Sequence, residues 1–317
     1  MNKNGYRADY VALLVVAVVL ALVPVGVGGG SYYLRIATLM LIYMAYAVAF
    51  NIIFGHTRQL FLCFGALAGS SAYLSVILAK KLALSPWETI PLGILFAGLL
   101  GGAFSYVSVR RGLGVIFVGI VTLVFSLIFH NLILGLRELT NGETGIETKA
   151  LGVGVLQSGR GSYYVILAVL MASLVLYHFL MRSRAGTAFR ALTDDEFAAE
   201  LVGIDVTLYK VLAASIGSAL VGAVGAVYAY YSGFISPTVY SLVSVDIVVL
   251  VTLLLGGMGT LVGPVLGGVF FTVLDEIVRP LGRLNVLVYG VLMIVLFITF
   301  RHGLVAMLRK IGKLRIP

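Results

Sequence analysis

Apolar runs long enough to cross a lipid bilayer recur along most of this 317-residue chain. A spanning helix needs about 20 predominantly apolar residues. Because the bilayer interior offers no water to backbone N–H and C=O groups, each run must satisfy these groups internally, as a helix does. The runs expected to span are 10–29, 35–55, 60–79, 89–108, 113–135, 162–181, 208–231 and 284–300. The sequence therefore predicts an all-α, polytopic membrane protein.

The composition agrees with this class. Charged residues make up only 11% of the chain, whereas a soluble domain carries about 25%. The net charge of +9 does not indicate nucleic-acid binding, because the basic residues are scattered between apolar runs, where they more often set membrane orientation. Cys63 is the single cysteine, so no disulfide framework is expected. The first run lacks a clear signal-peptide cleavage site, and we expect an uncleaved span.

The apolar region 243–276 is too long for one ordinary span, and glycines interrupt it at Gly256–Thr260. With a break there, the chain has about ten membrane segments, and most Lys and Arg residues fall on the side of the N-terminus. Without the break, the basic residues divide equally between the two sides. The break is therefore favoured, which makes both termini and residues 182–207 cytoplasmic. A re-entrant segment at the glycines remains an alternative.

The longest polar stretch expected on the outside is 136–161. Its turn signals, Asn141-Gly142 and Gly145, predict an irregular external loop. This loop is either a passive connector or a surface for an external partner. The whole chain, residues 1–317, is expected to form a single transmembrane domain.

The cytoplasmic loop 182–207 is unusually rich in charge for this chain and has the pattern of a short amphipathic helix over 194–203. Thr193 and Glu196 have the spacing of a capping box, with Asp194 and Asp195 in the first turn. Gly203 follows the last turn, where glycine commonly ends a helix. Phe197, Leu201 and Ile204 share one face. Such a helix is either a solvated loop element or a docking element for a soluble partner.

Motifs of enzyme active sites and nucleotide sites are absent from the sequence. The chain has no P-loop, no His-Glu-x-x-His and no Gly-x-Ser-x-Gly, so neither a cofactor nor catalysis is expected. The four histidines are dispersed, which argues against a metal site. No predicted span carries paired acids, which a proton relay would need. Asp246 is the one acidic residue expected within a span, near its outer end, whereas Asp275 and Glu276 are expected at the membrane interface.

A route for solute through the spans would be lined by small and polar groups. The polar candidates are Asn51, Gln59 and Thr122, and each is more often an interhelical hydrogen-bonding group than a solute contact. Most of the 38 glycines are expected to let helices approach closely. A minority are candidates for the translocation pathway: Gly55, Gly256, Gly257, Gly259 and Gly263, together with Pro264.

Several of these segments together resemble the M-type permease subunit of branched-chain (hydrophobic) amino-acid ABC transporters. The cytoplasmic loop resembles the family's docking loop in Asp195-Glu196-Phe-Ala198-Ala199-Glu-Leu-Val-Gly203, followed by Tyr209-Lys210. The other matching segments are Leu139–Ile146, Ile235-Ser-Pro237, Leu255–Gly267 and His302-Gly303-Leu304. The combination is more specific for the family than for the solute.

The resemblance implies a transport subunit in the cell membrane that works by alternating access and is surrounded by lipid. It implies three kinds of protein partner: ATP-binding subunits that hydrolyse ATP, a second permease subunit and an external solute-binding protein. The residues expected to couple to the ATPases are Arg184, Asp194, Asp195, Glu196, Phe197, Ala198, Ala199, Glu200, Leu201 and Gly203. The alternatives are a stand-alone secondary transporter or channel and an ABC sugar permease.

Overall fold

The computed structural model describes residues 3–26, 31–148 and 154–280 and a few positions between 287 and 295. Within these residues, five helices are long and apolar enough to cross a membrane: Tyr32–Gly55, Pro86–Arg110, Val115–Gly135, Gly159–Arg182 and Val206–Ser232. Leu13–Gly26 and Leu242–Gly256 are shorter apolar helices. The prediction of an all-α polytopic membrane protein is confirmed. The predicted span 284–300 and the C-terminus lie outside the fully described residues.

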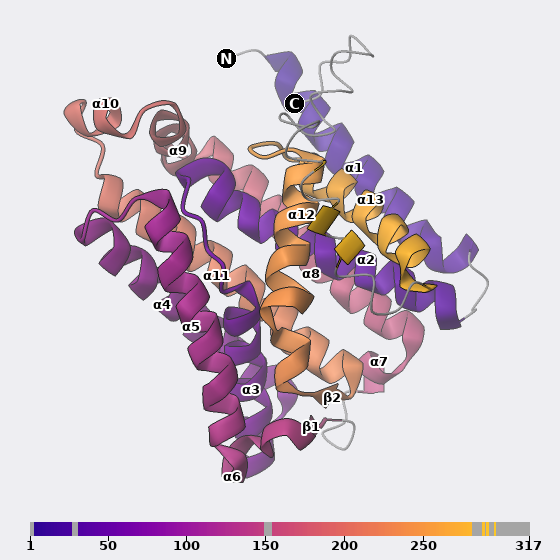
Figure 1. Cartoon of the computed structure of the whole chain (residues 1–317). Coiled ribbons are helices and arrows are strands. Elements are labelled where there is room, and N and C mark those ends of the chain that lie inside the picture. Colours follow the sequence, from indigo (N-terminus) through magenta and orange to yellow (C-terminus); the bar gives the residue numbers. More distant parts are fainter. Residues whose placement is uncertain are drawn as a thin grey trace.

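The long helices follow the predicted spans closely (Figure 1). They are α1 (Lys3–Gly26), α2 (Ser31–Phe50) with its π-helical continuation η1 (Asn51–Gly55), α3 (Phe64–Leu82), α4 (Pro86–Arg110), α5 (Val115–Gly135), α8 (Gly159–Arg182) and α11 (Val206–Ser232). The predicted span 60–79 begins too early, because the segment before Phe64 is not helical. The backbone N–H of Leu62 in that segment donates to the Thr122 hydroxyl on α5, at 2.9 Å.

The apolar region 243–276 is divided as predicted. The π-helical turn η5 (Leu242–Asp246) leads into α12 (Ile247–Gly256), and α13 (Gly263–Val278) follows after a non-helical stretch. Gly257 and Gly259 have φ of +111° and +73°, values that L side chains rarely adopt. The break therefore depends on glycine at these two positions.

The core forms around α11, which packs against α4, α3 and α2, while α2 also contacts α8, α12 and α13. Small residues bring these helices together. A Cβ on Gly225 of α11 would lie 2.4 Å from the Ala68 carbonyl oxygen of α3, and a Cβ on Gly222 would lie 2.7 Å from the Ala97 Cβ of α4. Such close backbone approach is how helices associate in lipid, where apolar surface alone does not drive association.

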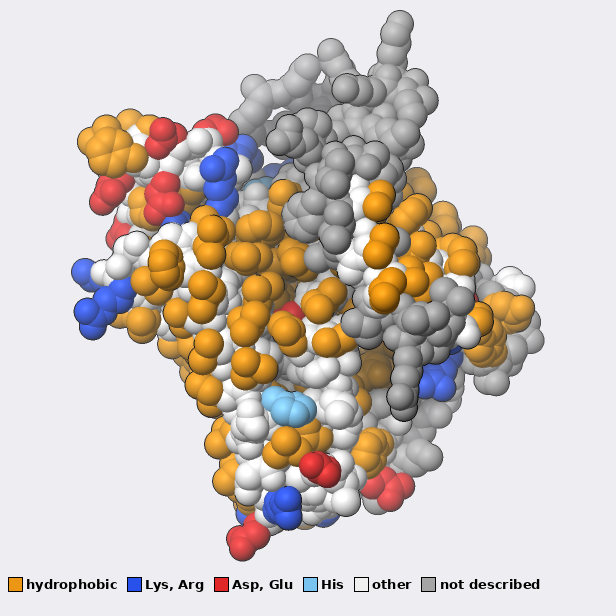
Figure 2. Space-filling view, in the orientation of Figure 1, with side chains coloured by type: hydrophobic (Ala, Val, Ile, Leu, Met, Phe, Trp, Pro, Cys, Tyr) orange, Lys and Arg blue, Asp and Glu red, His pale blue; other side chains and the backbone are white. Residues whose placement is uncertain are grey.

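One broad surface of the bundle is apolar. Figure 2 shows hydrophobic side chains covering α4 and α5, with Lys, Arg, Asp and Glu gathered towards the two ends of the molecule. The exposed residues of this surface include Leu95, Leu99, Ile116, Phe117 and Ile128, each more than half exposed. Because these residues are exposed on helices long enough to span, they are suited to face lipid.

The short elements lie at opposite ends of the bundle (Figure 1). One end carries α9 (Arg184–Asp194) and α10 (Glu196–Leu201), close to the start of α1. The other end carries α6 (Arg137–Thr140), the 3₁₀ turns η2 (Gly142–Thr144) and η4 (Pro237–Tyr240), and the strands β1 (Ile146–Glu147) and β2 (Phe234–Ile235). The helix α7 (Gly154–Gln157) precedes α8. Residues 136–148 and α9–α10 therefore lie at opposite ends of the bundle.

Within loop 136–161, β1 pairs with β2 in antiparallel register, Ile146 opposite Ile235 and Glu147 opposite Phe234. Gly145 has φ of +69°, and a Cβ there would lie 2.3 Å from the Ile235 carbonyl oxygen. The Thr148 N–H donates to the Gly233 carbonyl at 3.0 Å. The segment around Gly145 is thus joined to the end of α11 rather than being an unattached connector.

Candidate functional site

The charged segment 182–205 forms two helices rather than one, and its predicted N-cap is wrong. Thr193 lies inside α9, where its hydroxyl donates to the Phe189 carbonyl at 2.8 Å. Asp194 ends α9 instead of opening the next helix. Asp195 is the N-cap of α10, since its carboxylate accepts from the Ala198 N–H at 3.0 Å. The helix expected over 194–203 is therefore Glu196–Leu201, because Asp195, two residues after Thr193, makes the cap.

The tip formed by α10 and the residue after it is apolar and exposed. Phe197 is 71% exposed, Leu201 73% and Val202 77%. In Figure 2 this apolar tip is surrounded by acidic side chains. Ile204, predicted on the same face, is only half-buried, and Gly203 ends the segment with φ of +86°. An exposed apolar patch at the end of a membrane protein is typical of a protein contact.

The remaining coupling candidates divide by exposure. Arg184, Asp194, Asp195, Glu196, Ala198 and Glu200 are exposed, whereas Ala199 is buried against the bundle. Ala199 thus anchors α10, and the charged residues surround the apolar tip.

Lys210 joins α10 to the spans. Its ammonium contacts both carboxylate oxygens of Glu196 at 2.6 Å. The Lys210 carbonyl accepts from the side-chain amide of Gln59 at 3.0 Å, and the amide oxygen of Gln59 accepts from the Ser105 hydroxyl of α4 at 2.6 Å. Gln59, a candidate for the solute route, therefore connects α4, α11 and the segment after α2. The role of Lys210 was not predicted, although its place on the first turns of α11 is a signal that it lies near α10.

His56 makes a second connection between α9 and the spans. Its Nε2 lies 2.7 Å from the Tyr177 hydroxyl of α8, and its carbonyl accepts from the Thr193 hydroxyl at 2.8 Å. Burial lowers the pKa of His56 to about 4, and the nearby charge of Arg190 acts in the same direction. The ring is therefore neutral at physiological pH. No sequence pattern indicates this contact, because its partners are far apart along the chain.

Asn51 brings the glycine-rich break against α2. Its side-chain amide donates to the Thr260 carbonyl at 2.8 Å, and its amide oxygen accepts from the Gly259 N–H at 2.7 Å. A Cβ on Gly55 would lie 2.3 Å from the same amide oxygen and 3.1 Å from the Gly259 nitrogen. Asn51, Gly55 and Gly259 are thus one site, built by the π-helical end of α2.

The other glycines of the break pack against backbone. A Cβ on Gly256 would lie 1.8 Å from the Gly263 carbonyl oxygen, and one on Gly263 would lie 2.1 Å from the Gly257 carbonyl oxygen. Pro264 occupies the first turn of α13, where its missing N–H is tolerated. Thr122 lies apart from this cluster, on α5. The candidates for the solute route therefore form one cluster at the break and two separate polar contacts, at Gln59 and Thr122.

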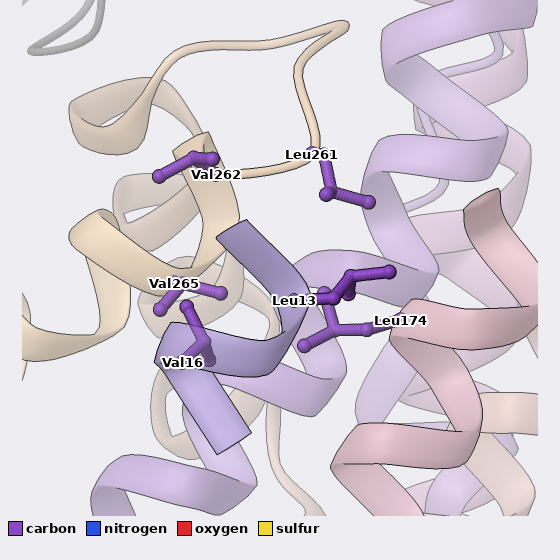
Figure 3. A pocket seen from close by; sticks show the side chains of 6 residues that line it. All are labelled: Leu13, Val16, Leu174, Leu261, Val262 and Val265. Carbon is purple, nitrogen blue, oxygen red and sulfur yellow. The ribbon is translucent and has the colours of Figure 1, made fainter. Parts of the chain in front are cut away.

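Beside the break, α1 and α8 leave only a small apolar gap. Its volume is about 10 Å³, and it is lined by Leu13 and Val16 of α1, Leu174 of α8, and Leu261, Val262 and Val265. Figure 3 shows these side chains converging from the three elements. A space of this size without polar partners holds no water. It is a packing defect and carries no ligand.

Asp246 is buried at the end of η5 and caps a helix. One carboxylate oxygen accepts from the backbone N–H groups of Phe64 and Gly65, at the start of α3. A carboxylate at this position interacts favourably with the helix dipole. Among the described residues, no cluster of His, Cys, Asp or Glu that could hold a metal ion is found.

Comparisons with known proteins agree with this architecture. A family model described as "Branched-chain amino acid transport system / permease component" matches residues 32–297. The high-affinity branched-chain amino acid transport system permease protein LivM of Salmonella typhimurium is 30% identical over 96% of this chain and 76% of its own length. LivM of Escherichia coli is 29% identical, with the same coverage.

A more distant relative is the autoinducer 2 import system permease protein LsrC of Enterobacter sp., 29% identical over 87% of this chain and 79% of its own length. No solved structure matches the chain. The relatives are permease subunits of transport systems and not enzymes. Together with the bundle of span-length helices, the match over most of the sequence shows that this chain belongs to the family of branched-chain amino acid transport system permease components.

Proposed function

We propose that this chain is the membrane permease subunit of an ABC importer for branched-chain or related hydrophobic amino acids, in the cell membrane. The observation that carries the proposal is the α9–α10 unit. It presents an exposed apolar tip and acidic residues at one end of the bundle, while Glu196 and Thr193 connect it to the spans. Similarity to the LivM permeases supports the solute class.

The mechanism follows from this placement. ATP-binding subunits contact α10 and supply the energy, because the chain has no phosphate-binding motif of its own. Their movement passes through Lys210 and Gln59 to α11 and α4, and through Thr193 and His56 to α8 and the end of α2. The opposite end, with the β1–β2 pair, receives solute from an external binding protein. A second permease subunit completes the pathway, and the two alternate between outward and inward access.

The test is uptake by the complete complex, this chain with its partner subunits and binding protein, reconstituted in proteoliposomes. Gly203→Pro places a proline at φ of +86°, which its ring forbids, and is expected to abolish ATP-dependent leucine uptake. Gly112→Pro is the matched control, because Gly112 also has positive φ, +61°, in the turn after α4. It is expected to retain uptake.

Equal activity of both variants, with normal coupling of ATP hydrolysis to uptake, would refute the docking role of α10. Uptake of leucine without ATP or without partner subunits would favour the stand-alone transporter instead. Because the chain also resembles autoinducer 2 permeases, autoinducer 2 is the competing solute in the same assay, and a preference for it would correct the solute class.

A further inference from the structure

Two neighbouring cavities follow α2 from its first turn into the middle of the span. The outer cavity, about 320 Å³, is lined by Tyr32, Arg35, Ile36 and Leu39 of α2 and by Arg279, just after α13. The inner cavity, about 210 Å³, is lined by Leu39, Tyr43 and Tyr46 of α2, by Tyr228 of α11 and by Tyr240 and Ser244. Leu39 belongs to both cavities. Tyr46 lies roughly 20 Å along the helix from Tyr32 at 1.5 Å per residue, which places the inner cavity well inside the span.

The inner cavity, here called the tyrosine chamber, is amphipathic. Among the described residues, the hydroxyls of Tyr43, Tyr46 and Tyr228 make no hydrogen bond, whereas Tyr240 donates to the Gly225 carbonyl at 3.1 Å. Three phenol groups beside a cavity can therefore hydrogen-bond to an occupant, while their ring faces and edges contact its apolar part. The small gap beside α1 has none of these properties.

The mouth of the outer cavity carries two arginines, and Tyr32 at the same mouth donates to Glu276. Arg279 pairs with Glu276 at 2.9 Å, but Arg35 is in no ion pair among the described residues. Arg35 is exposed. A guanidinium is suited to bind a carboxylate through two parallel hydrogen bonds. The pair of cavities thus offers a carboxylate site at the mouth and an amphipathic site further in.

Beyond the tyrosine chamber, α2 is closed by aromatic packing. Phe50, one turn after Tyr46, is 1% exposed, with its ring centroid 5.3 Å from that of Phe54 and 4.7 Å from that of Phe64. Among the described residues, the two cavities that follow α2 therefore end before Phe50. The packed rings around Phe50 follow the tyrosine chamber along α2, where a closed gate of an alternating-access transporter would lie.

We propose that the tyrosine chamber is the intramembrane transit site of the solute, an amino acid whose carboxylate is received by Arg35 and whose apolar side chain passes Leu39 to lie among Tyr43, Tyr46 and Tyr228. This inference deepens the proposed function and rests on it for the solute class. The rings of Phe50, Phe54 and Phe64 are the closed gate that must separate for release on the far side.

Uptake by the reconstituted complex tests the chamber first. Tyr46→Trp adds volume inside the chamber and is expected to lower the rate of leucine uptake about tenfold or more, since extra atoms in a fitted space cost packing energy. Tyr106→Trp, on the exposed face of α4, is the control and should transport normally.

The double variant Tyr43→Phe/Tyr46→Phe keeps the shape of the tyrosine chamber and removes two hydroxyls. It should assemble normally and raise KM several-fold, because the solute loses two hydrogen-bonding partners.

Arg35 is tested in the same assay. Arg35→Gln should raise KM, and Arg35→Lys, which keeps the charge but not the two-pronged geometry, should raise it less. If neither Arg35→Gln nor Arg35→Lys changes KM, the role of Arg35 at the mouth is refuted. Arg35 is then only an interfacial anchor that contacts lipid headgroups.

A binding measurement separates this proposal from the proposed function. In a Cys63→Ala background, Ser244→Cys is treated with a membrane-impermeant thiol reagent with and without leucine, and leucine is expected to slow the labelling. Thr144→Cys, exposed in the external loop, is the control that leucine should not protect. Protection without ATP-dependent uptake would overturn the importer and leave the chamber standing. Uptake with no protection, and with Tyr46→Trp fully active, would overturn the chamber and leave the importer standing.

Discussion

His56 is enclosed at the junction of three helices. Its ring lies beside Tyr177 and Phe189, with centroid distances of 5.5 Å and 6.5 Å, and its carbonyl accepts from Thr193. Protonation would place a charge in this buried environment, close to Arg190. The junction between α9 and the spans therefore depends on a neutral histidine.

This gives a pH-dependence with a defined sign. The pKa of His56 is lowered to about 4 in the folded protein, whereas the unfolded chain titrates near 6.5. The contribution of neutral His56 to the free energy of unfolding is fully present above pH 6.5. It is lost as the pH falls towards 4, by about 3 kcal/mol, because the unfolded state binds the proton more tightly. Melting temperatures of the purified protein in detergent should fall between pH 7 and pH 5. Compared with the unsubstituted protein, this fall in melting temperature should be smaller in His56→Asn and equally large in His130→Asn. An equal fall in all three proteins would contradict this assignment.

At the scale of elements, α10 is short and has few contacts of its own, so its orientation depends on Asp195, Ala199 and the Glu196–Lys210 pair. The Glu196 side chain is 51% exposed, and an exposed pair contributes roughly 0.2–1 kcal/mol to stability. The pair is therefore more important for the direction of α10 than for the stability of the fold.

A charge swap tests this role of the pair. Glu196→Lys places two ammonium groups side by side and should reduce ATP-dependent uptake strongly with little change in melting temperature. The double variant Glu196→Lys/Lys210→Glu restores the attraction and should recover most of the activity. A double variant as inactive as the single one would show that a partner subunit reads Glu196 directly, and would contradict its role in orienting α10.

At the scale of the whole molecule, the arrangement separates two functional ends by the length of the spans. The loop with β1 lies at one end and α9–α10 at the other (Figure 1). The distribution of Lys and Arg along the sequence predicts that the α9–α10 end is cytoplasmic.

Thiol labelling of intact cells tests this orientation. In a Cys63→Ala background, an impermeant maleimide should label Thr144→Cys from outside. It should label Leu201→Cys, which replaces a side chain that is 73% exposed, only after the membrane is permeabilised. The opposite pattern would reverse the topology and remove the basis for contact between α10 and cytoplasmic ATPases.

The sequence alone determined where most membrane helices lie, the break near Gly256 and the position of the acidic segment. The expected spans 113–135 and 208–231 differ by at most two residues from Val115–Gly135 and Val206–Ser232. These features are local, because lipid requires each span to be a long apolar helix that satisfies its own backbone. Asp195 in place of Thr193 as N-cap is a local choice between two capping residues two positions apart, and the pattern did not resolve it.

Only the tertiary structure decided what the polar and aromatic side chains do. Asn51 contacts the backbone of Gly259 and Thr260, His56 contacts Tyr177, and Tyr43, Tyr46 and Tyr228 meet at one cavity. An asparagine or a tyrosine within an apolar run has the same local pattern whether it braces a neighbouring helix or faces a cavity. Which of these it does depends on the crossing of helices that are more than 100 residues apart in the chain, and this crossing is set by close packing at small residues rather than by hydrophobicity.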